Sequence, residues 1–239
     1  MPEFISGMHN YCDRWCERCT FTARCAVAEA EAETSDEERD INNEAFWKSI
    51  AANFAAAKSM LEEKAAEFGI ELTPPTAEEW SKYKNAEKDF IRDQPLTRSA
   101  ETYWKESHKL LENTDDWLIF APLDEAERAE MLAVVHWYQF FISAKIQRAF
   151  HGLIDFDGTY TDEELHDPQS DTNGSAKIAL IAAARSQMAW TALLSNENEP
   201  HIQPLISLLE TIKHQTENSF PNAQNFIRPG FDEINEIVM

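Results

Sequence analysis

All four cysteines of the chain fall between residues 12 and 25, in the pattern C-x3-C-x2-C-x5-C. Disulfides are rare in reducing compartments, whereas four thiols this close together are typical of a metal site. We therefore expect Cys12, Cys16, Cys19 and Cys25 to ligate one metal centre, with unrelated thiols or disulfides as the alternative. Such a centre constrains the fold of the N-terminal segment, because all four sulfur atoms must converge.

The spacing of the cysteines favours an iron-sulfur cluster over zinc. Structural zinc sites usually join two C-x2-C turns across about a dozen residues, and this sequence has only one such pair, Cys16 and Cys19. A single stretch with gaps of two and three residues is similar in kind to the sequences by which ferredoxins ligate a [4Fe-4S] cluster. We expect a [4Fe-4S] cluster as the cofactor, and zinc is the alternative.

The cysteines also restrict the backbone that carries them. Cys12, Cys16 and Cys19 would share one face of a helix, but an unbroken helix would separate Cys12 from Cys19 by about 10.5 Å along its axis. The segment must therefore depart from a straight helix. The arginines between the cysteines would offset thiolate charge, or would pair with the neighbouring acids: Arg14, Arg18 and Arg24.

Two short motifs resemble enzyme signatures but lie in the wrong context. Residues 12–19 resemble the cluster motif of radical S-adenosylmethionine enzymes, which implies a β/α barrel and one open iron; the chain lacks alternating strands, and Cys25 would fill that iron. Residues 155–159 resemble the nucleophile motif of haloacid-dehalogenase phosphatases, which must end a strand, whereas here a helical pattern precedes it. Neither activity is carried over to this chain.

The rest of the chain has a helical composition, rich in Ala and Glu, with Gly and Pro mostly between the segments. Side chains suited to capping boxes stand at three of the expected helix starts, namely Ser35 with Glu38, Thr76 with Glu79, and Asp124 with Glu127. We expect an all-α bundle of about six helices, over residues 35–68, 76–93, 97–113, 124–152, 175–194 and 201–217.

Apolar periodicity indicates which faces are buried. The first helix has a stripe that we expect to be buried: Phe46, Ile50, Phe54, Ala57 and Leu61. The helices over 124–152 and 175–194 are apolar on every side, so they should be central and pack against each other. We expect residues 1–33 to form a cysteine-rich metal-binding segment, and residues 34–239 a helical bundle whose C-terminal tail lies along the surface.

Among the basic residues on the two central helices, three are candidates for a binding role. Lys145, Arg148 and Arg185 cannot be buried without a carboxylate, an anionic ligand or a route to water. Structural ion pairs are one interpretation. The other is that the three converge on an anionic small molecule or on the cluster, which makes them candidate cofactor-binding residues. The acidic loop over 153–173 is a further candidate, for weak cation binding.

Charge limits the partners that we expect. The chain has 43 acidic and 21 basic side chains, a net charge of −22, which disfavours nucleic acid and anionic lipid. No run approaches the roughly 18 apolar residues of a membrane span, and no leader pattern opens the chain, so we expect a cytoplasmic protein. The partner would be an unknown protein or a small anionic molecule.

No catalytic constellation is complete, so the sequence leaves enzymatic activity open. The expected role is redox, sensing or cluster-stabilised binding, with a zinc-stapled helical interaction module without catalytic activity as the alternative.

Overall fold

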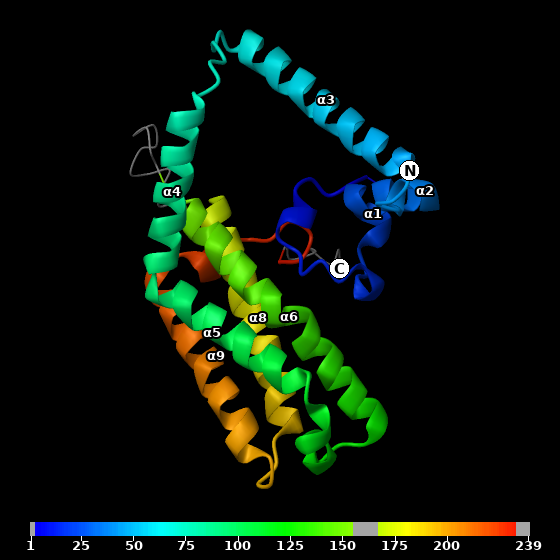
Figure 1. Cartoon of the computed structure of the whole chain (residues 1–239), viewed down its shortest axis with the longest axis vertical. Coiled ribbons are helices and arrows are strands. Elements are labelled where there is room, and N and C mark those ends of the chain that lie inside the picture. The colour runs from blue at the N-terminus through cyan, green and yellow to red at the C-terminus, as the bar shows by residue number, and fades with distance from the viewer. Residues whose placement is uncertain (1–2, 155–166, 233–239) are drawn as a thin grey trace, which may run out of the picture. The chain divides into compact units, whose positions relative to one another are not determined.

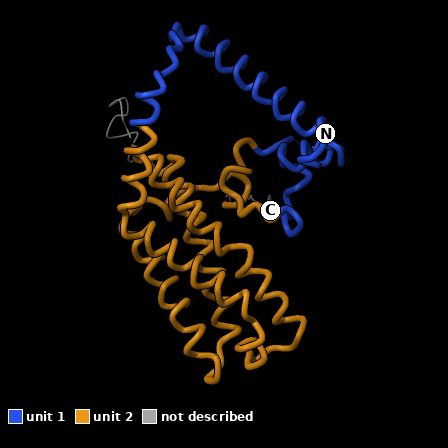
Figure 2. Tube along the Cα trace, in the orientation of Figure 1, with its two compact units in different colours: residues 1–5, 16–82 blue, residues 6–15, 83–239 orange. Residues whose placement is uncertain are grey.

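The computed structural model describes residues 3–154 and 167–232, and within these ranges its regular elements are all helices (Figure 1). The chain divides into two compact units, which are described separately (Figure 2). Unit 1 comprises residues 1–5 and 16–82, and unit 2 comprises residues 6–15 and 83–239. The expected all-α class is confirmed for the described residues.

The core of unit 2 consists of four helices, α5 (Pro95–Leu111), α6 (Glu125–His151), α8 (Asp171–Leu193) and α9 (Glu199–Ser219). Helix α6 packs on α8, α8 on α9, α9 on α5 and α5 on α6, so the four helices close into a bundle. The expected packing of the two most apolar helices is confirmed by the α6–α8 pair. The largest side chains that are fully buried in this core include Tyr103, Trp117, Tyr138 and Trp190.

Local capping chemistry sets the helix starts. Asp124 accepts a hydrogen bond from the Glu127 backbone N–H (2.9 Å), and the Glu127 carboxylate accepts one from the Asp124 N–H (3.1 Å). The same exchange at Thr76 precedes α4 (Ala77–Asp93). Helix α8 begins four residues before the expected Ser175, because the Ser170 hydroxyl already caps it.

Unit 1 contains α1 (Ala26–Glu33), α2 (Asp36–Arg39) and α3 (Glu44–Glu67). The expectation of one continuous helix over 35–68 is wrong at its start. Asp40 accepts from the Asn43 N–H through its carbonyl (2.8 Å) and from the Asn42 N–H through its carboxylate (2.9 Å). Asn43 then caps α3 by accepting from the Ala45 N–H. These short polar side chains replace one turn of helix with local hydrogen bonds.

The expected burial of the stripe on α3 is also wrong for three of its four large side chains, while the fourth, Phe46, is partly buried. Phe54 is 74% exposed, Leu61 59% and Ile50 37%. Ala65 is the sole buried residue of this helix. Six helices of 17 or more residues are present in the described part, as expected in number, but the buried core of the bundle comes chiefly from the four helices of unit 2.

The segment after α9 packs inward rather than along the surface. Phe220, Ala223 and Phe226 are each at most 2% exposed, and the Phe220 ring lies 4.9 Å from that of Phe150. Burial of these aromatic side chains holds this part of the tail against the bundle. Across the described helices, no stretch is both long and apolar enough to cross a membrane.

Candidate functional site

The first candidate site is the surface of unit 2 on which residues 6–15 lie. Met8 is 2% exposed, which fixes the start of this segment in the unit. The Trp15 ring stacks on Trp137 of α6, with ring centroids 5.0 Å apart and planes inclined by 13°. Between these anchors the Lys145 ammonium donates to the Asn10 carbonyl at 3.0 Å. The segment is therefore held by both apolar and polar contacts.

Asp13 is the centre of the polar contacts. Its carboxylate accepts from the Tyr138 hydroxyl at 2.8 Å and from the Arg185 guanidinium, and its carbonyl accepts from the Trp137 indole N–H at 2.8 Å. The Arg185 guanidinium also donates to the Tyr138 hydroxyl. Burial, together with the neighbouring carboxylate, raises the pKa of Tyr138 to about 12. At neutral pH this tyrosine is thus a hydrogen-bond donor to Asp13.

A second polar cluster fixes Tyr11. Arg148 of α6 holds Asp171 at the start of α8 with two hydrogen bonds, of 3.0 and 2.8 Å, and the Tyr11 hydroxyl donates to the same carboxylate at 3.1 Å. The Tyr11 ring lies 4.5 Å from that of Phe226. Burial and the charge of Asp171 raise the pKa of Tyr11 to about 12.

The three basic residues singled out in the sequence thus all face the segment 6–15 or its partners. Arg148 and Arg185 form ion pairs with carboxylates, and Lys145 binds a carbonyl and lies 5.3 Å from the centre of the Phe141 ring. For the two arginines, these contacts agree with the interpretation that the basic residues form structural ion pairs. Recognition of an anionic molecule by these residues stays a prediction.

Cys12 belongs to this same segment and is half-buried. Its thiol donates to the His9 carbonyl at 3.5 Å. Burial raises the pKa of the Cys12 thiol, but the Arg14 backbone N–H and the charges of Arg14 and Lys145 oppose that rise. Arg14 has a φ of 59°, the left-handed backbone that non-glycine residues seldom adopt.

The other three cysteines lie in unit 1. Cys16 begins a short 3-10 helix, Cys16–Arg18, and its carbonyl accepts from the Cys19 N–H at 3.1 Å. The Cys19 sulfur accepts from the Phe21 N–H at 3.4 Å. Cys25 is buried and occupies the N-cap position of α1. The segment therefore departs from a straight helix, as the spacing of the cysteines requires.

Within residues 3–154 and 167–232, no three Cys, His, Asp or Glu side chains lie close enough together to hold a metal ion. The metal centre at Cys12, Cys16, Cys19 and Cys25 thus stays a prediction. Residues 155–166 lie outside the described part, and with them most of the acidic loop and the phosphatase-like motif at 155–159.

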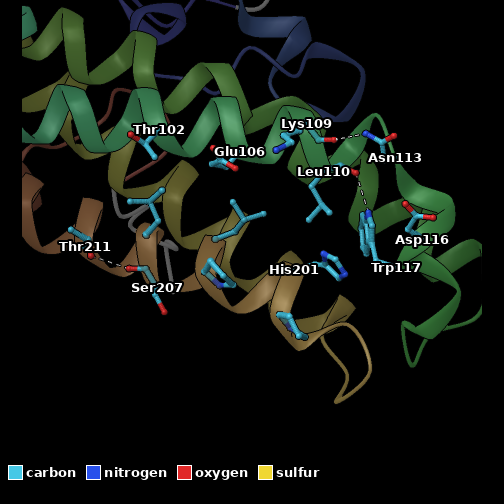
Figure 3. A pocket seen from close by; sticks show the side chains of 14 residues that line it. Thr102, Glu106, Lys109, Leu110, Asn113, Asp116, Trp117, His201, Ser207 and Thr211 are labelled. Atoms are coloured by element: carbon cyan, nitrogen blue, oxygen red, sulfur yellow. Dashed lines mark hydrogen bonds between the residues drawn. The ribbon is translucent and has the colours of Figure 1, made fainter.

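A cavity of about 820 Å³ between α5 and α9 is a separate feature of unit 2 (Figure 3). Its size suits a small molecule. Glu106 and Lys109 come from α5 and His201 from α9, while Trp117 closes one end by donating to the Leu110 carbonyl at 3.0 Å. Its lining mixes acidic and basic side chains and includes none of the residues predicted from the sequence. The signal that would have found it is the helical spacing of three of its α5 members, Thr102, Glu106 and Lys109.

Sequence reasoning did not foresee the residues that organise the docked segment: Asp13, Trp137, Tyr138 and Asp171. The available signal was the aromatic pair Tyr11 and Trp15, which is unusual in a short polar segment and indicates packing on a core. Comparison with known proteins adds no further guide, because no family model, no curated protein and no solved structure matches this chain.

Proposed function

We propose that Cys12, Cys16, Cys19 and Cys25 ligate one metal centre, a [4Fe-4S] cluster, with a redox, sensing or cluster-stabilised binding role. The observation that carries the proposal is a hydrogen bond to one of the four sulfur atoms. The Phe21 N–H, two residues after Cys19, donates to the Cys19 sulfur at 3.4 Å, and hydrogen bonding from the Arg14 backbone opposes the rise in the pKa of Cys12. Such hydrogen bonds stabilise the thiolate form that ligates metals.

The charge around Cys12 supports the same proposal. Burial and the charge of Asp13 raise the pKa of Cys12, and the charges of Arg14 and Lys145 oppose that rise. A cluster ligated by four thiolates carries net negative charge, and nearby cations together with hydrogen bonds to sulfur are the means by which proteins stabilise such clusters and set their potentials. When bound, the cluster would supply one-electron chemistry, while the chain supplies the thiolates, the N–H donors and the cations.

The second candidate is a zinc-stapled helical interaction module without catalytic activity. The compact 3-10 turn from Cys16 to Cys19 favours it, because a C-x2-C turn of this kind is half of a usual structural zinc site. In that case the metal would only stabilise the N-terminal segment. The two candidates use the same ligands and differ in the metal.

Metal analysis of the full chain, purified without oxygen, tests both candidates. For a cluster we expect about four iron and four sulfide per chain and absorption at about 400 nm. Each of the variants Cys12→Ser, Cys16→Ser, Cys19→Ser and Cys25→Ser should lose this absorption, while Thr20→Ala, an exposed control in the same segment, should keep it. Colourless protein with one zinc per chain would overturn the cluster in favour of zinc. Protein that binds neither metal would overturn both.

A further inference from the structure

Helix α3 has a continuous apolar surface that is exposed. We define the α3 stripe as Trp47, Ile50, Phe54 and Leu61. At about 100° of rotation per residue, these four side chains fall within an arc of about 60°. They are 56%, 37%, 74% and 59% exposed, respectively. Single exposed apolar residues are ordinary, but an aligned row of large ones is typical of a surface that another molecule covers.

The helix itself is well formed without a covering partner. Asn43 caps its start, and side-chain pairs span its turns, namely Lys48 with Glu44 (3.0 Å), Lys58 with Glu62 (3.6 Å) and Lys64 with Glu67 (2.6 Å). The apolar residues of the stripe are therefore not needed for local helix formation. Trp47 is also positioned by its indole N–H, which donates to the Ile41 carbonyl at 2.9 Å.

Charge near the start of α3 indicates the kind of partner. Residues 26–40, which form α1 and α2, contain seven carboxylates and one arginine. Helix α2 packs against α3, so part of this acidic surface adjoins the helix that carries the stripe. The lysines of α3 already have carboxylate neighbours in their own helix, which leaves a surplus of negative charge. A second copy of this chain, with its own net charge of −22, would be repelled at long range.

We propose that the α3 stripe binds a basic amphipathic helix of another protein. The apolar face of that helix would cover Trp47, Phe54 and Leu61, and its Lys and Arg side chains would face the carboxylates of α2, which packs against α3. Helix-on-helix docking of this kind uses apolar anchors at spacings of three, four and seven residues, which the stripe provides. This inference goes beyond the proposed metal centre and is independent of the metal that the cysteines bind.

The test uses the full chain and two designed peptides of about 18 residues, about five helical turns. One carries Leu on one face and Lys on the other, and its counterpart carries Glu in place of Lys. Isothermal titration calorimetry should show one Lys peptide bound per chain, more weakly at higher salt, and no binding of the Glu peptide. Equal binding of both peptides would overturn the charge argument.

Matched variants separate the stripe from general attraction between opposite charges. Phe54→Glu and Ala52→Glu each add one negative charge, but Ala52 lies on the opposite side of α3. We expect Phe54→Glu to weaken binding of the Lys peptide at least about tenfold, as for a central apolar anchor, and Ala52→Glu to leave it unchanged or slightly stronger. If Phe54→Glu binds as tightly as the control, charge alone drives binding and the proposal is wrong. Circular dichroism of both variants verifies that the helices are retained.

Two further outcomes would also overturn the proposal. A concentration-dependent dimer in light scattering that Phe54→Glu abolishes would identify a second copy as the occupant of the α3 stripe. A monomer that binds neither peptide would show that the chain covers the stripe itself. Metal content measured on the same samples reports separately on the cysteine site, so a failure of one proposal is distinguishable from a failure of the other.

Discussion

Arg185 and Asp13 form an ion pair across 172 positions of the sequence, and the Tyr138 hydroxyl bonds both partners. This contact joins α8 to the N-terminal segment that carries Cys12. Because Asp13 also accepts the Trp137 indole N–H through its carbonyl, both the side chain and the backbone of this residue are fixed on α6 and α8. The position of Cys12 in unit 2 thus depends on groups far from it in sequence.

We expect Arg185→Met to release the segment 6–15 from the bundle. Asp13 would keep the Tyr138 hydrogen bond but lose its cation, at a cost of about 1–2 kcal/mol in the free energy of unfolding, since the pair is only partly buried. Chemical denaturation measures this cost, and limited proteolysis should cut near Trp15 sooner than in the parent chain. Arg185→Lys, which keeps the charge, should lower the free energy of unfolding by less. An unchanged proteolysis pattern would mean that the ion pair does not hold the segment.

The interior glycine of α8 is expected to resist substitution. Alanine usually stabilises a helix interior by up to about 1 kcal/mol relative to glycine. At Gly174, however, an added Cβ would lie 2.4 Å from the Tyr11 ring and 2.7 Å from the Phe226 ring. We expect Gly174→Ala to lower the free energy of unfolding by about 1–3 kcal/mol through overpacking. The double variant Gly174→Ala, Tyr11→Leu should recover part of the loss, and a stabilised single variant would contradict the close packing of Tyr11.

Acid should weaken the contact between α8 and the segment that follows α9. Burial raises the pKa of Asp232, but hydrogen bonds from Arg228 and Lys177 outweigh it and hold this pKa well below its usual range. A depressed folded-state pKa stabilises the protein above the unfolded-state pKa of about 4, and this stabilisation is lost as the pH falls below that value. The difference in unfolding free energy between the parent chain and Asp232→Asn should therefore shrink from pH 6 to pH 3. A constant difference would show that protonation of Asp232 is not coupled to unfolding.

The helix starts that carry a capping box were predictable from the sequence because capping is local. The pairs Ser35 with Glu38 and Asp124 with Glu127 lie three residues apart, and their side chains meet the backbone wherever the helix packs. Burial was less predictable. The period of Phe54 and Leu61 correctly placed them on one face of α3, but periodicity does not say what covers that face.

The candidate site was predictable only in part, for a related reason. The four clustered cysteines and the basic residues of the central helices can be recognised in the sequence. Their neighbours cannot, because the contacts of Asp13 with Arg185 and of Tyr11 with Asp171 form only when residues 6–15 pack on helices more than a hundred residues away in the sequence. No local sequence pattern indicates this long-range packing, so neither contact could be predicted from the sequence.

Lys145 offers a test of the link between the bundle and the metal. Lys145 is 8% exposed, and its ammonium binds the Asn10 carbonyl and favours the Cys12 thiolate. We expect Lys145→Met, which keeps the length of the side chain, to lower metal content after anaerobic preparation several-fold. The positive charge of Lys145 opposes the rise in the pKa of Cys12 that burial causes. Without that charge the pKa of Cys12 should rise further, and less thiolate should be available for ligation.

The fold of Lys145→Met should survive, because methionine fills the same space without needing a polar partner. Lys145→Arg provides the control that retains the charge and should keep most of the metal. Metal content and unfolding free energy are measured on the same preparations. Metal loss with a nearly unchanged unfolding free energy of the metal-free protein would show that Lys145 acts through the charge at Cys12. Equal metal content in the Met and Arg variants would contradict that role, since the Arg variant retains the positive charge and the Met variant does not.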